Sequence, residues 1–210
     1  GETPEVKNFF VCCGFNSIGL ASAGGAGRAT AEWMMKGGIN EDIFSLDISR
    51  FEKFHSEIKF ITERVTETLG DLYAMHWPYK QHTTSRNQKI LPYHNNLKEA
   101  HACFGEGGGF ERPMWYALNN NNPEYQYSFG YQNWYESAKF ETTHARKHVA
   151  LFELTPFSKF EIKGPNAHEV LQYLCANNIK DTNGTTTYTQ MLNSNGGIEA
   201  DLTVTCIEKN

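Results

Sequence analysis

The chain of 210 residues is long enough for one large domain or two small ones. Its formal net charge of −5 argues against nucleic acid as the main partner, because phosphate binding needs a concentrated basic face. No apolar run approaches the roughly 20 residues that a membrane-spanning helix requires. The five cysteines are an odd number without a CxxC pair, so we expect buried reduced thiols rather than a disulfide framework or a zinc site.

The first segment predicts a strand, a glycine-containing turn and a helix. Residues 9–13 form a continuous apolar run, which is typical of a strand buried on both faces. Asn16 or Ser17 can cap the helix, which we expect to run to about Lys36 and to stop at Gly37. The helix start collects unpaired backbone N–H groups and the positive end of the helix dipole at one point. Such a point suits an electron-rich group.

Small residues mark one face of this helix. Gly24, Gly27 and Ala31 are spaced at i, i+3 and i+7, and each glycine costs helix propensity, roughly 1 kcal/mol. The sequence therefore predicts a close approach to a sheet or a ligand, with simple tight packing as the plain alternative. A phosphate turn of the GxGxxG kind fits less well than a flavin ring, because a loop and another helix follow instead of a second strand.

The middle of the chain predicts mostly helices. Apolar residues between 58 and 72 recur at helical spacing, residues 78–91 read as a loop, and Pro92 suits the first turn of a shorter helix to about Ala102. A short strand at residues 103–104 precedes three glycines. An aromatic segment, residues 125–135, is expected to lie across another surface, and a helix is expected at residues 136–148.

The last third predicts strands around one helix. Residues 150–152 and 159–163 read as strands, and a helix follows the turn at residues 164–166. Residues 186–192 and 198–207 predict a hairpin around a turn rich in asparagine and glycine. The chain starts without Met and ends just after this strand, so we expect it to be an internal piece of a longer protein.

Several motifs occur in one fixed order. They are Gly14-Phe-Asn-Ser-x-Gly19, Ala23-Gly-Gly-x-Gly27, Gly109-Phe-Glu-Arg-Pro113, Gly164-Pro165, Tyr188-Thr-x-Met-Leu-Asn193 and Gly196-Gly-x-x-x-Asp-Leu-Thr-Val204. Together they resemble the dimethylglycine and sarcosine dehydrogenase family. The last motifs resemble the start of that family's folate domain, which it shares with the aminomethyltransferase of glycine cleavage. The resemblance covers essentially the whole chain.

The resemblance implies an α+β fold in three parts. Residues 1–48 would end an FAD-binding oxidoreductase domain, residues 49–106 would form a small central connector, and residues 107–210 would begin an aminomethyltransferase-like folate-binding domain. The GxGxxG motif that would hold the FAD pyrophosphate is absent. We therefore expect this stretch alone to bind FAD poorly and to be inactive.

The resemblance also implies a function. The parent would be an FAD-dependent dehydrogenase or oxidase that demethylates a small N-methyl amino acid of the dimethylglycine or sarcosine type and passes the carbon to tetrahydrofolate. Its electron acceptor would be an electron-transfer flavoprotein or oxygen. Its location would be the cytoplasm of a bacterium or the mitochondrial matrix of a eukaryote.

Site residues follow from the same resemblance. Asp201 would be the catalytic acidic residue beside folate, and Tyr188 and Phe157 would contact folate with it. The flavin contacts would be Gly14, Phe15, Asn16, Ser17, Ile18, Gly19 and Leu20. Taken alone, Asp201 and Tyr188 would instead be a solvated strand residue and an edge-strand aromatic.

Two other functions stay open. One is a non-catalytic regulator of the pyruvate dehydrogenase phosphatase type, which has the same domain layout, and the other is a folate-binding module without redox chemistry. His76, His82, His94 and His101 are scattered, which favours no metal site. Arg86 is expected to form a structural or solvent-exposed ion pair.

Overall fold

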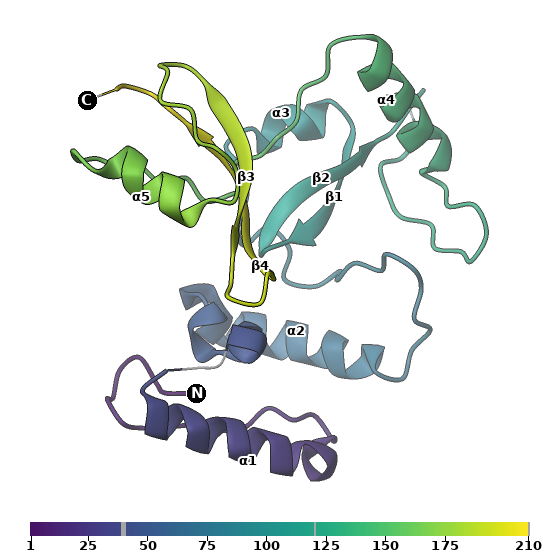
Figure 1. Cartoon of the computed structure of the whole chain (residues 1–210). Coiled ribbons are helices and arrows are strands. Elements are labelled where there is room, and N and C mark those ends of the chain that lie inside the picture. Colours follow the sequence, from purple (N-terminus) through teal and green to yellow (C-terminus); the bar gives the residue numbers. More distant parts are fainter. Residues whose placement is uncertain (39–40, 120, 210) are drawn as a thin grey trace. The chain divides into compact units, whose positions relative to one another are not determined.

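The computed structural model describes residues 1–38, 41–119 and 121–209, which divide into two compact units, Gly1–Pro156 and Phe157–Asn210. The first unit contains α1 (Gly19–Lys36), three 3-10 helices (Glu41–Leu46, Ile48–Arg50 and Lys53–Ser56), α2 (Ile58–Asp71), α3 (His94–Glu99), β1 (Ala102–Gly107), β2 (Phe110–Tyr116) and α4 (Tyr135–Lys147). The second unit contains α5 (Ala167–Leu174), β3 (Thr186–Leu192) and β4 (Ile198–Thr205). Figure 1 shows the two antiparallel hairpins, β1–β2 and β3–β4. This mixture of helices and small sheets confirms that part of the predicted fold class.

Helix α1 has the predicted end but a different start. Its last residue is Lys36, and Gly37 follows in the left-handed conformation at φ 75° and donates its N–H to Trp33. The expected cap by Asn16 or Ser17 is wrong, because Ile18 holds the N-cap position and no side chain caps the helix. Both residues have positive φ, 42° and 71°, whereas a capping side chain normally starts from extended backbone.

The predicted buried strand at residues 9–13 is also wrong. Phe10 forms only an isolated antiparallel bridge with Glu2, and the side chain of Phe9 is 55% exposed. Cys12 and Cys13 are exposed, in contrast to the expectation of buried thiols. A strand buried on both faces needs neighbours on both sides, and the described residues supply one short segment on one side.

The β1–β2 hairpin forms the interior of the first unit. Leu91, Ala102, Cys103 and Trp115 are its most buried apolar residues, each at most 4% exposed. Burial raises the pKa of the Cys103 thiol to about 11. The sequence predicts β1 but misses β2, because Pro113 interrupts the strand pattern. The structure accommodates Pro113 at an irregularity in the pairing, where the register shifts between Cys103 and Phe104.

Helix α2 and the predicted loop after it are joined by charge. The Arg64 guanidinium donates to both oxygens of Glu106 on β1, at 2.9 and 2.8 Å, and to the carbonyl of Thr84 at 2.7 Å. Because both carboxylate oxygens and the loop carbonyl share one guanidinium, α2, the loop and β1 are held together at a single point.

The ion pair between Arg86 and Glu111 is the more buried of the two. The Glu111 side chain is 3% exposed and accepts from Arg86 Nε at 2.7 Å, from Arg86 Nη2 and from the amide of Asn87 at 2.8 Å. Arg86 also donates to the carbonyls of His82 and Phe104. The predicted role of Arg86 as a structural ion-pair residue is thus confirmed, and the pair fixes the loop of residues 78–91 against the hairpin.

The aromatic segment packs inside the first unit. Tyr125 stacks with Tyr127 at a centroid distance of 5.6 Å and meets Trp134 edge to face at 5.0 Å. Trp134 in turn lies over the buried Trp115. The Tyr127 hydroxyl accepts from the amide of Gln81, so this segment also holds the loop.

The part of the chain from residue 150 onward confirms two predictions and corrects two. Helix α5 and the β3–β4 hairpin lie where the sequence places them. Residues 150–152 and 159–163 are all described and form no strand. Phe152 and Phe160 are 72% and 88% exposed, so their alternating pattern finds no partner strand in the described parts of the chain.

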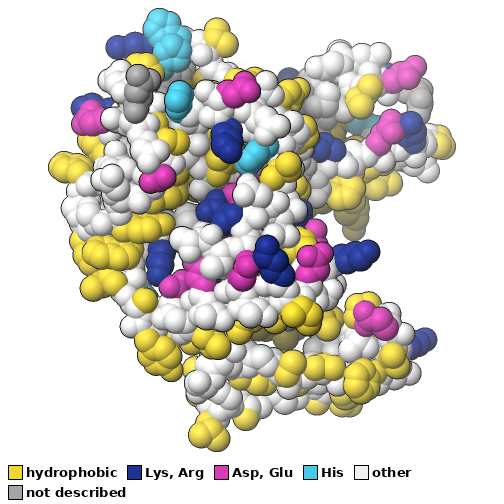
Figure 2. All heavy atoms as spheres, turned by 180° about the vertical axis from the view of Figure 1, so that it is seen from behind, with side chains coloured by type: hydrophobic (Ala, Val, Ile, Leu, Met, Phe, Trp, Pro, Cys, Tyr) yellow, Lys and Arg dark blue, Asp and Glu magenta, His cyan; other side chains and the backbone are white. Residues whose placement is uncertain are grey.

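Exposed apolar side chains are common on this chain. No described residue of α1 is buried, and the side chains of Leu20 and Met35 are 101% and 87% exposed. In Figure 2, yellow hydrophobic side chains lie on the lowest part of the molecule, where Figure 1 draws α1. No helix in the described residues has the length and apolar character needed to cross a bilayer.

Replacing Glu111 by Ala should lower the free energy of unfolding by about 3 kcal/mol, because the half-buried Arg86 guanidinium then lacks its partner. The double variant Arg86→Met with Glu111→Leu should lose less than Glu111→Ala, since no unpaired charge remains. Glu32→Ala is the control, because its partner Arg28 has an 81% exposed side chain and little or no loss is expected. Urea unfolding followed by tryptophan fluorescence measures all three. Equal losses for Glu111→Ala and Glu32→Ala would contradict the role given to the buried pair.

Glu67 should make stability depend on pH. Burial opposes its ionisation, but hydrogen bonds from the Thr84 hydroxyl, from both amides and from the Thr83 hydroxyl outweigh this and lower its pKa from 4.5 to about 2. Because the folded pKa is lower, the stabilisation is complete above about pH 4.5 and is lost as the pH falls to about 2.

Glu67→Gln should therefore lower the free energy of unfolding, by on the order of 1 kcal/mol near neutrality. This loss should shrink as the pH falls from about 4.5 to about 2. Urea unfolding at several pH values measures it. Glu136→Gln, whose carboxylate is mostly exposed, should show no such trend. A constant difference for Glu67→Gln would refute the assignment.

Candidate functional site

The β3–β4 hairpin presents one buried and one exposed face. Thr187 and Thr189 are 8% and 1% exposed, whereas Tyr188 between them is 59% exposed. Side chains alternate between the faces of a strand, so Tyr188 and Gln190 share the exposed face. Across the hairpin, Gln190 pairs with Asp201, which places the Asp201 side chain on that face as well.

Three side chains meet on this face: Tyr188, Gln190 and Asp201, here named the hairpin cluster. Gln190 Nε2 donates to Asp201 Oδ1 at 3.2 Å. A hydrogen bond to the Asp201 carboxylate raises the pKa of Tyr188, while a hydrogen bond with Gln190 acts in the opposite direction. The structure thus brings together two residues that the sequence places thirteen positions apart, and adds Gln190, which sequence reasoning missed.

A neighbouring segment supports the backbone of the hairpin cluster. The amide of Ala176 donates to the carbonyl of Gln190 at 2.8 Å, and Cys175 forms an isolated bridge with Met191. Asn177 donates from its side chain to the carbonyl of Tyr188 and from its amide to the buried hydroxyl of Thr189, both at 3.0 Å. Strand β3 is therefore held on both edges at the residues that carry the cluster.

The turn fixes which residues face each other. The side-chain oxygen of Asn193 accepts from the amides of Asn195 and Gly197 at 3.0 and 2.9 Å, and Gly196 has a φ of 80° that favours glycine. A shift of one residue in this pairing would turn Asp201 to the opposite face of the hairpin. The turn residues are therefore what positions the carboxylate beside Tyr188.

Phe157 is the third residue predicted to contact folate. It lies at the start of the second unit, before α5, and its side chain is 59% exposed. It is not part of the strand pairing that brings Tyr188 and Asp201 together. Its role remains a prediction.

The predicted flavin contacts, Gly14 to Leu20, form an open turn before α1. Gly14, Asn16 and Ser17 all have positive φ, and no side chain caps the helix that follows. Ile18 and Leu20 are 62% and 101% exposed. The first-turn amides have no side-chain acceptor, so the residues present fit an electron-rich group such as the pyrimidine end of a flavin.

The glycine face of α1 meets nothing in the described residues. A Cβ atom built on Gly24 or on Gly27 finds no atom within 4 Å. Tight packing within the described chain therefore does not explain these glycines.

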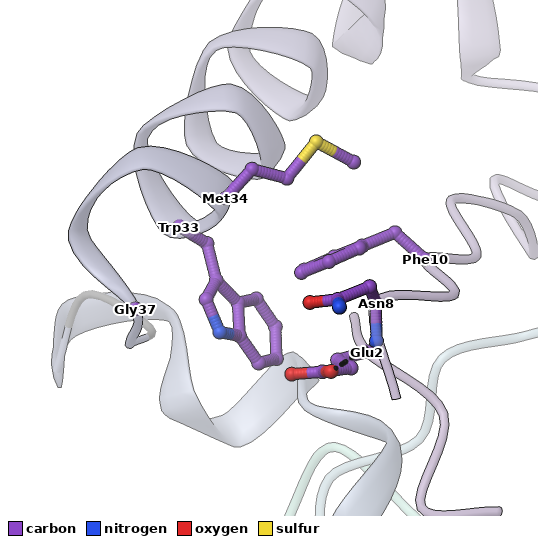
Figure 3. A pocket seen from close by; sticks show the side chains of 6 residues that line it. All are labelled: Glu2, Asn8, Phe10, Trp33, Met34 and Gly37. Carbon is purple, nitrogen blue, oxygen red and sulfur yellow. Dashed lines mark hydrogen bonds between the residues drawn. The ribbon is translucent and has the colours of Figure 1, made fainter. Parts of the chain in front are cut away.

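A hollow of about 280 Å³ lies near the other end of α1. Figure 3 shows its lining, in which Phe10 meets Trp33 edge to face at 5.7 Å and the amide of Asn8 donates to Glu2. Trp33 is fourteen residues from Gly19, which is about 21 Å along a helix. The hollow is therefore separate from the predicted flavin contact.

Possible metal ligands form no cluster in the part of the chain that the structure describes, where no group of three or more His, Cys, Asp or Glu could hold an ion. The expectation of scattered histidines overlooks one pair. His144 and His148 are four residues apart at the end of α4, with ring centroids 4.6 Å apart. Two ligands fall short of the three or four protein ligands of zinc sites.

Replacing Asp201 by Asn should lower the pKa of Tyr188 toward the ordinary value for tyrosine, since the carboxylate that raises it is removed. The measurement is a pH titration of the protein carrying ring-labelled tyrosine by NMR, with Tyr188→Phe to assign the signal. Glu199→Gln serves as control, because Glu199 pairs with Asn193 at the turn. A Tyr188 pKa that stays the same in Asp201→Asn would show that the two residues are not joined in solution.

Two family models match the chain. The GCVT N-terminal domain matches residues 93–210, more than half of the chain, and the FAD dependent oxidoreductase central domain matches residues 36–90. The hairpin cluster lies within the first of these matches, and Arg64 lies within the second.

Curated relatives match nearly all of the chain. 4-Methylaminobutanoate oxidase (formaldehyde-forming) of Paenarthrobacter nicotinovorans is 43% identical over 98% of this chain and 25% of its own length. The mitochondrial pyruvate dehydrogenase phosphatase regulatory subunit of Mus musculus is 34% identical over 100% and 24%, and mitochondrial sarcosine dehydrogenase of Homo sapiens is 31% identical over 97% and 25%. The chain thus spans about a quarter of the length of these relatives. The relatives that match it include sarcosine and dimethylglycine dehydrogenases. The chain belongs to the family in which an FAD dependent oxidoreductase central domain is followed by a GCVT N-terminal domain.

Proposed function

We propose that the full protein uses FAD to oxidise an N-methyl amino acid of the dimethylglycine or sarcosine type and passes the released carbon to tetrahydrofolate at the hairpin cluster. One observation carries this proposal. Asp201 and Tyr188, to which the family resemblance assigns folate contacts, share the exposed face of β3–β4, where Gln190 donates to Asp201 at 3.2 Å.

The relatives support the redox part of the proposal. Their names include an oxidase of 4-methylaminobutanoate, a sarcosine dehydrogenase and a dimethylglycine dehydrogenase. All three names denote oxidation of an amino acid that carries a methyl group on nitrogen. In this proposal the electron acceptor is either an electron-transfer flavoprotein or oxygen. The protein is located in the mitochondrial matrix or in the bacterial cytoplasm.

The hairpin cluster suits carbon capture. Oxidation of the N-methyl group leaves an iminium carbon, which a folate nitrogen attacks with loss of its proton. Attack by the second folate nitrogen then breaks the bond between this carbon and the substrate amine, which leaves carrying the two protons that folate loses. The Asp201 carboxylate, exposed and oriented by Gln190, is placed to accept a hydrogen bond from a folate N–H and then its proton. Tyr188 and Phe157, with exposed rings, would pack on the pterin.

The flavin would be held in part by residues 14–20. The free amides at the start of α1 and the exposed backbone of Gly14 to Gly19 would face the pyrimidine end of the ring, where they favour negative charge. When bound, FAD would supply the acceptor for the hydride of the N-methyl group. In this proposal residues 1–48 close the FAD domain, residues 49–106 connect, and residues 107–210 begin the folate domain.

A non-catalytic regulator is the second candidate. The observation in its favour is the mouse regulatory subunit, which is 34% identical over the whole chain. The hairpin cluster argues for the enzyme, because a surface that works only through protein contacts does not need an oriented carboxylate beside a phenol. A folate-binding module without redox chemistry would share the cluster but would carry no flavin.

An anaerobic titration separates the three candidates. The full protein should show a flavin absorbance that bleaches on addition of sarcosine, dimethylglycine or 4-methylaminobutanoate. A colourless protein that binds folate would indicate the module without redox chemistry. A protein with no flavin, no bleaching and no folate binding would indicate the regulator.

Replacing Asp201 by Asn should leave the rate of flavin bleaching unchanged and lower the yield of methylenetetrahydrofolate about 100-fold, the lower range for loss of one acid–base group. Free formaldehyde should rise by the amount of carbon no longer captured. Both products are measured in one reaction with tetrahydrofolate present. An equal loss of bleaching and capture would count against a role for Asp201 confined to the folate step.

A further inference from the structure

Gln190 lies between the two residues of the proposed folate site. It lies directly opposite Asp201 across the hairpin and two positions from Tyr188 along β3, all on the exposed face. Its Nε2 group donates to Asp201 Oδ1 at 3.2 Å, and Tyr188 follows on the same face of the strand. The three side chains are therefore neighbours on one face of the hairpin, linked by the hydrogen bond between Gln190 and Asp201.

The amide group is chemically suited to this place. A side-chain amide has two N–H donors on one nitrogen, so it can serve the carboxylate and the phenol oxygen together. A hydrogen bond to an ionised acceptor is stronger than one between neutral groups. Asp201 is therefore fixed by the amide in a way that exposed carboxylates on strands usually are not.

The backbone of Gln190 cannot easily move. Its neighbour across the hairpin is Asp201 itself, and on the other edge its carbonyl accepts from Ala176 at 2.8 Å. Thr189 beside it is 1% exposed and accepts from the amide of Asn177. The side chain that holds Asp201 thus starts from a fixed point, which lowers the entropy lost when a ligand binds.

We propose that Gln190 is a positioning residue, whose side-chain amide holds the Asp201 carboxylate beside Tyr188 in the arrangement that receives a folate N–H. This proposal rests on the proposed function. Gln190 itself acts on the ligand through Asp201 and Tyr188.

Two variants test the proposal. Gln190→Met keeps the length of the side chain and removes both donors, and Gln190→Glu keeps the shape but places a second carboxylate against Asp201. Glu199→Gln is the matched control, because it changes another amide–carboxylate pair of the same hairpin, Asn193 with Glu199 at 2.7 Å, outside the cluster. The full protein is used throughout, with 5-formyltetrahydrofolate as the stable probe and calorimetry as the binding measurement.

Gln190→Met should weaken binding of the probe about tenfold, the loss expected of one hydrogen bond to a charged group. Gln190→Glu should bind weakly above neutrality and recover in mild acid, where the facing carboxylates take up a proton. Glu199→Gln should bind like the parent. In the tyrosine NMR titration, the pKa of Tyr188 should rise further in Gln190→Met, because the hydrogen bond that lowers it is lost.

The outcomes separate this inference from the proposed function. If the parent binds the probe and Gln190→Met binds it equally well, Gln190 has no positioning role and the proposed function stands. If Gln190→Glu is weakened equally at every pH, the loss is structural and the proposal is overturned. If the parent binds no folate probe at all, the proposed function fails and this inference fails with it.

Discussion

The first unit depends on one buried ion pair. Glu111 sits on a strand with a 3% exposed side chain and draws Arg86, Asn87 and, through Arg86, the carbonyls of His82 and Phe104 to one place. Desolvation of these charges is costly, and only a complete set of hydrogen bonds offsets it. The long loop between α2 and α3 is therefore held in place by the ion pair and its hydrogen bonds. The same loop holds α2 through Arg64 and the aromatic segment through Tyr127.

The second unit depends on register. The Asn193 turn and the bridge between Cys175 and Met191 fix the pairing of β3 with β4, and the pairing decides that Asp201 faces the same side as Tyr188. Neither residue is buried, so packing does not hold them. Their arrangement is a consequence of backbone geometry, and the side-chain hydrogen bonds then complete it.

Local signals predict the regular elements well. Helical spacing gives α2 and α5, glycine gives the end of α1, and the Asn–Gly turn gives the β3–β4 hairpin. Predictions that need distant partners fail. Residues 159–163 have a strand pattern but no partner strand among the described residues, and residues 9–13 form only the bridge between Phe10 and Glu2. Strand β2 is missed because of Pro113, which the structure accommodates next to a bulge in β2 itself, where Met114 has no partner on β1. Sequence reasoning misses Gln190 for a similar reason, because its role depends on Asp201, its partner across the hairpin.

The position of the Tyr188 phenol beside the Asp201 carboxylate has a consequence for selectivity. In the proposed reaction a ligand must compete with a phenol for the carboxylate, so it gains a place only by offering a good donor of its own. Tetrahydrofolate has N–H groups on both reacting nitrogens, whereas its methylene product has a carbon bridge where those hydrogens were. The product therefore does not compete with Tyr188 for the carboxylate, and Tyr188 can hydrogen-bond to Asp201 again when the product leaves. Such a site distinguishes tetrahydrofolate from its methylene product by the N–H donors of the ligand rather than by the shape of the ligand. This favours release of the product.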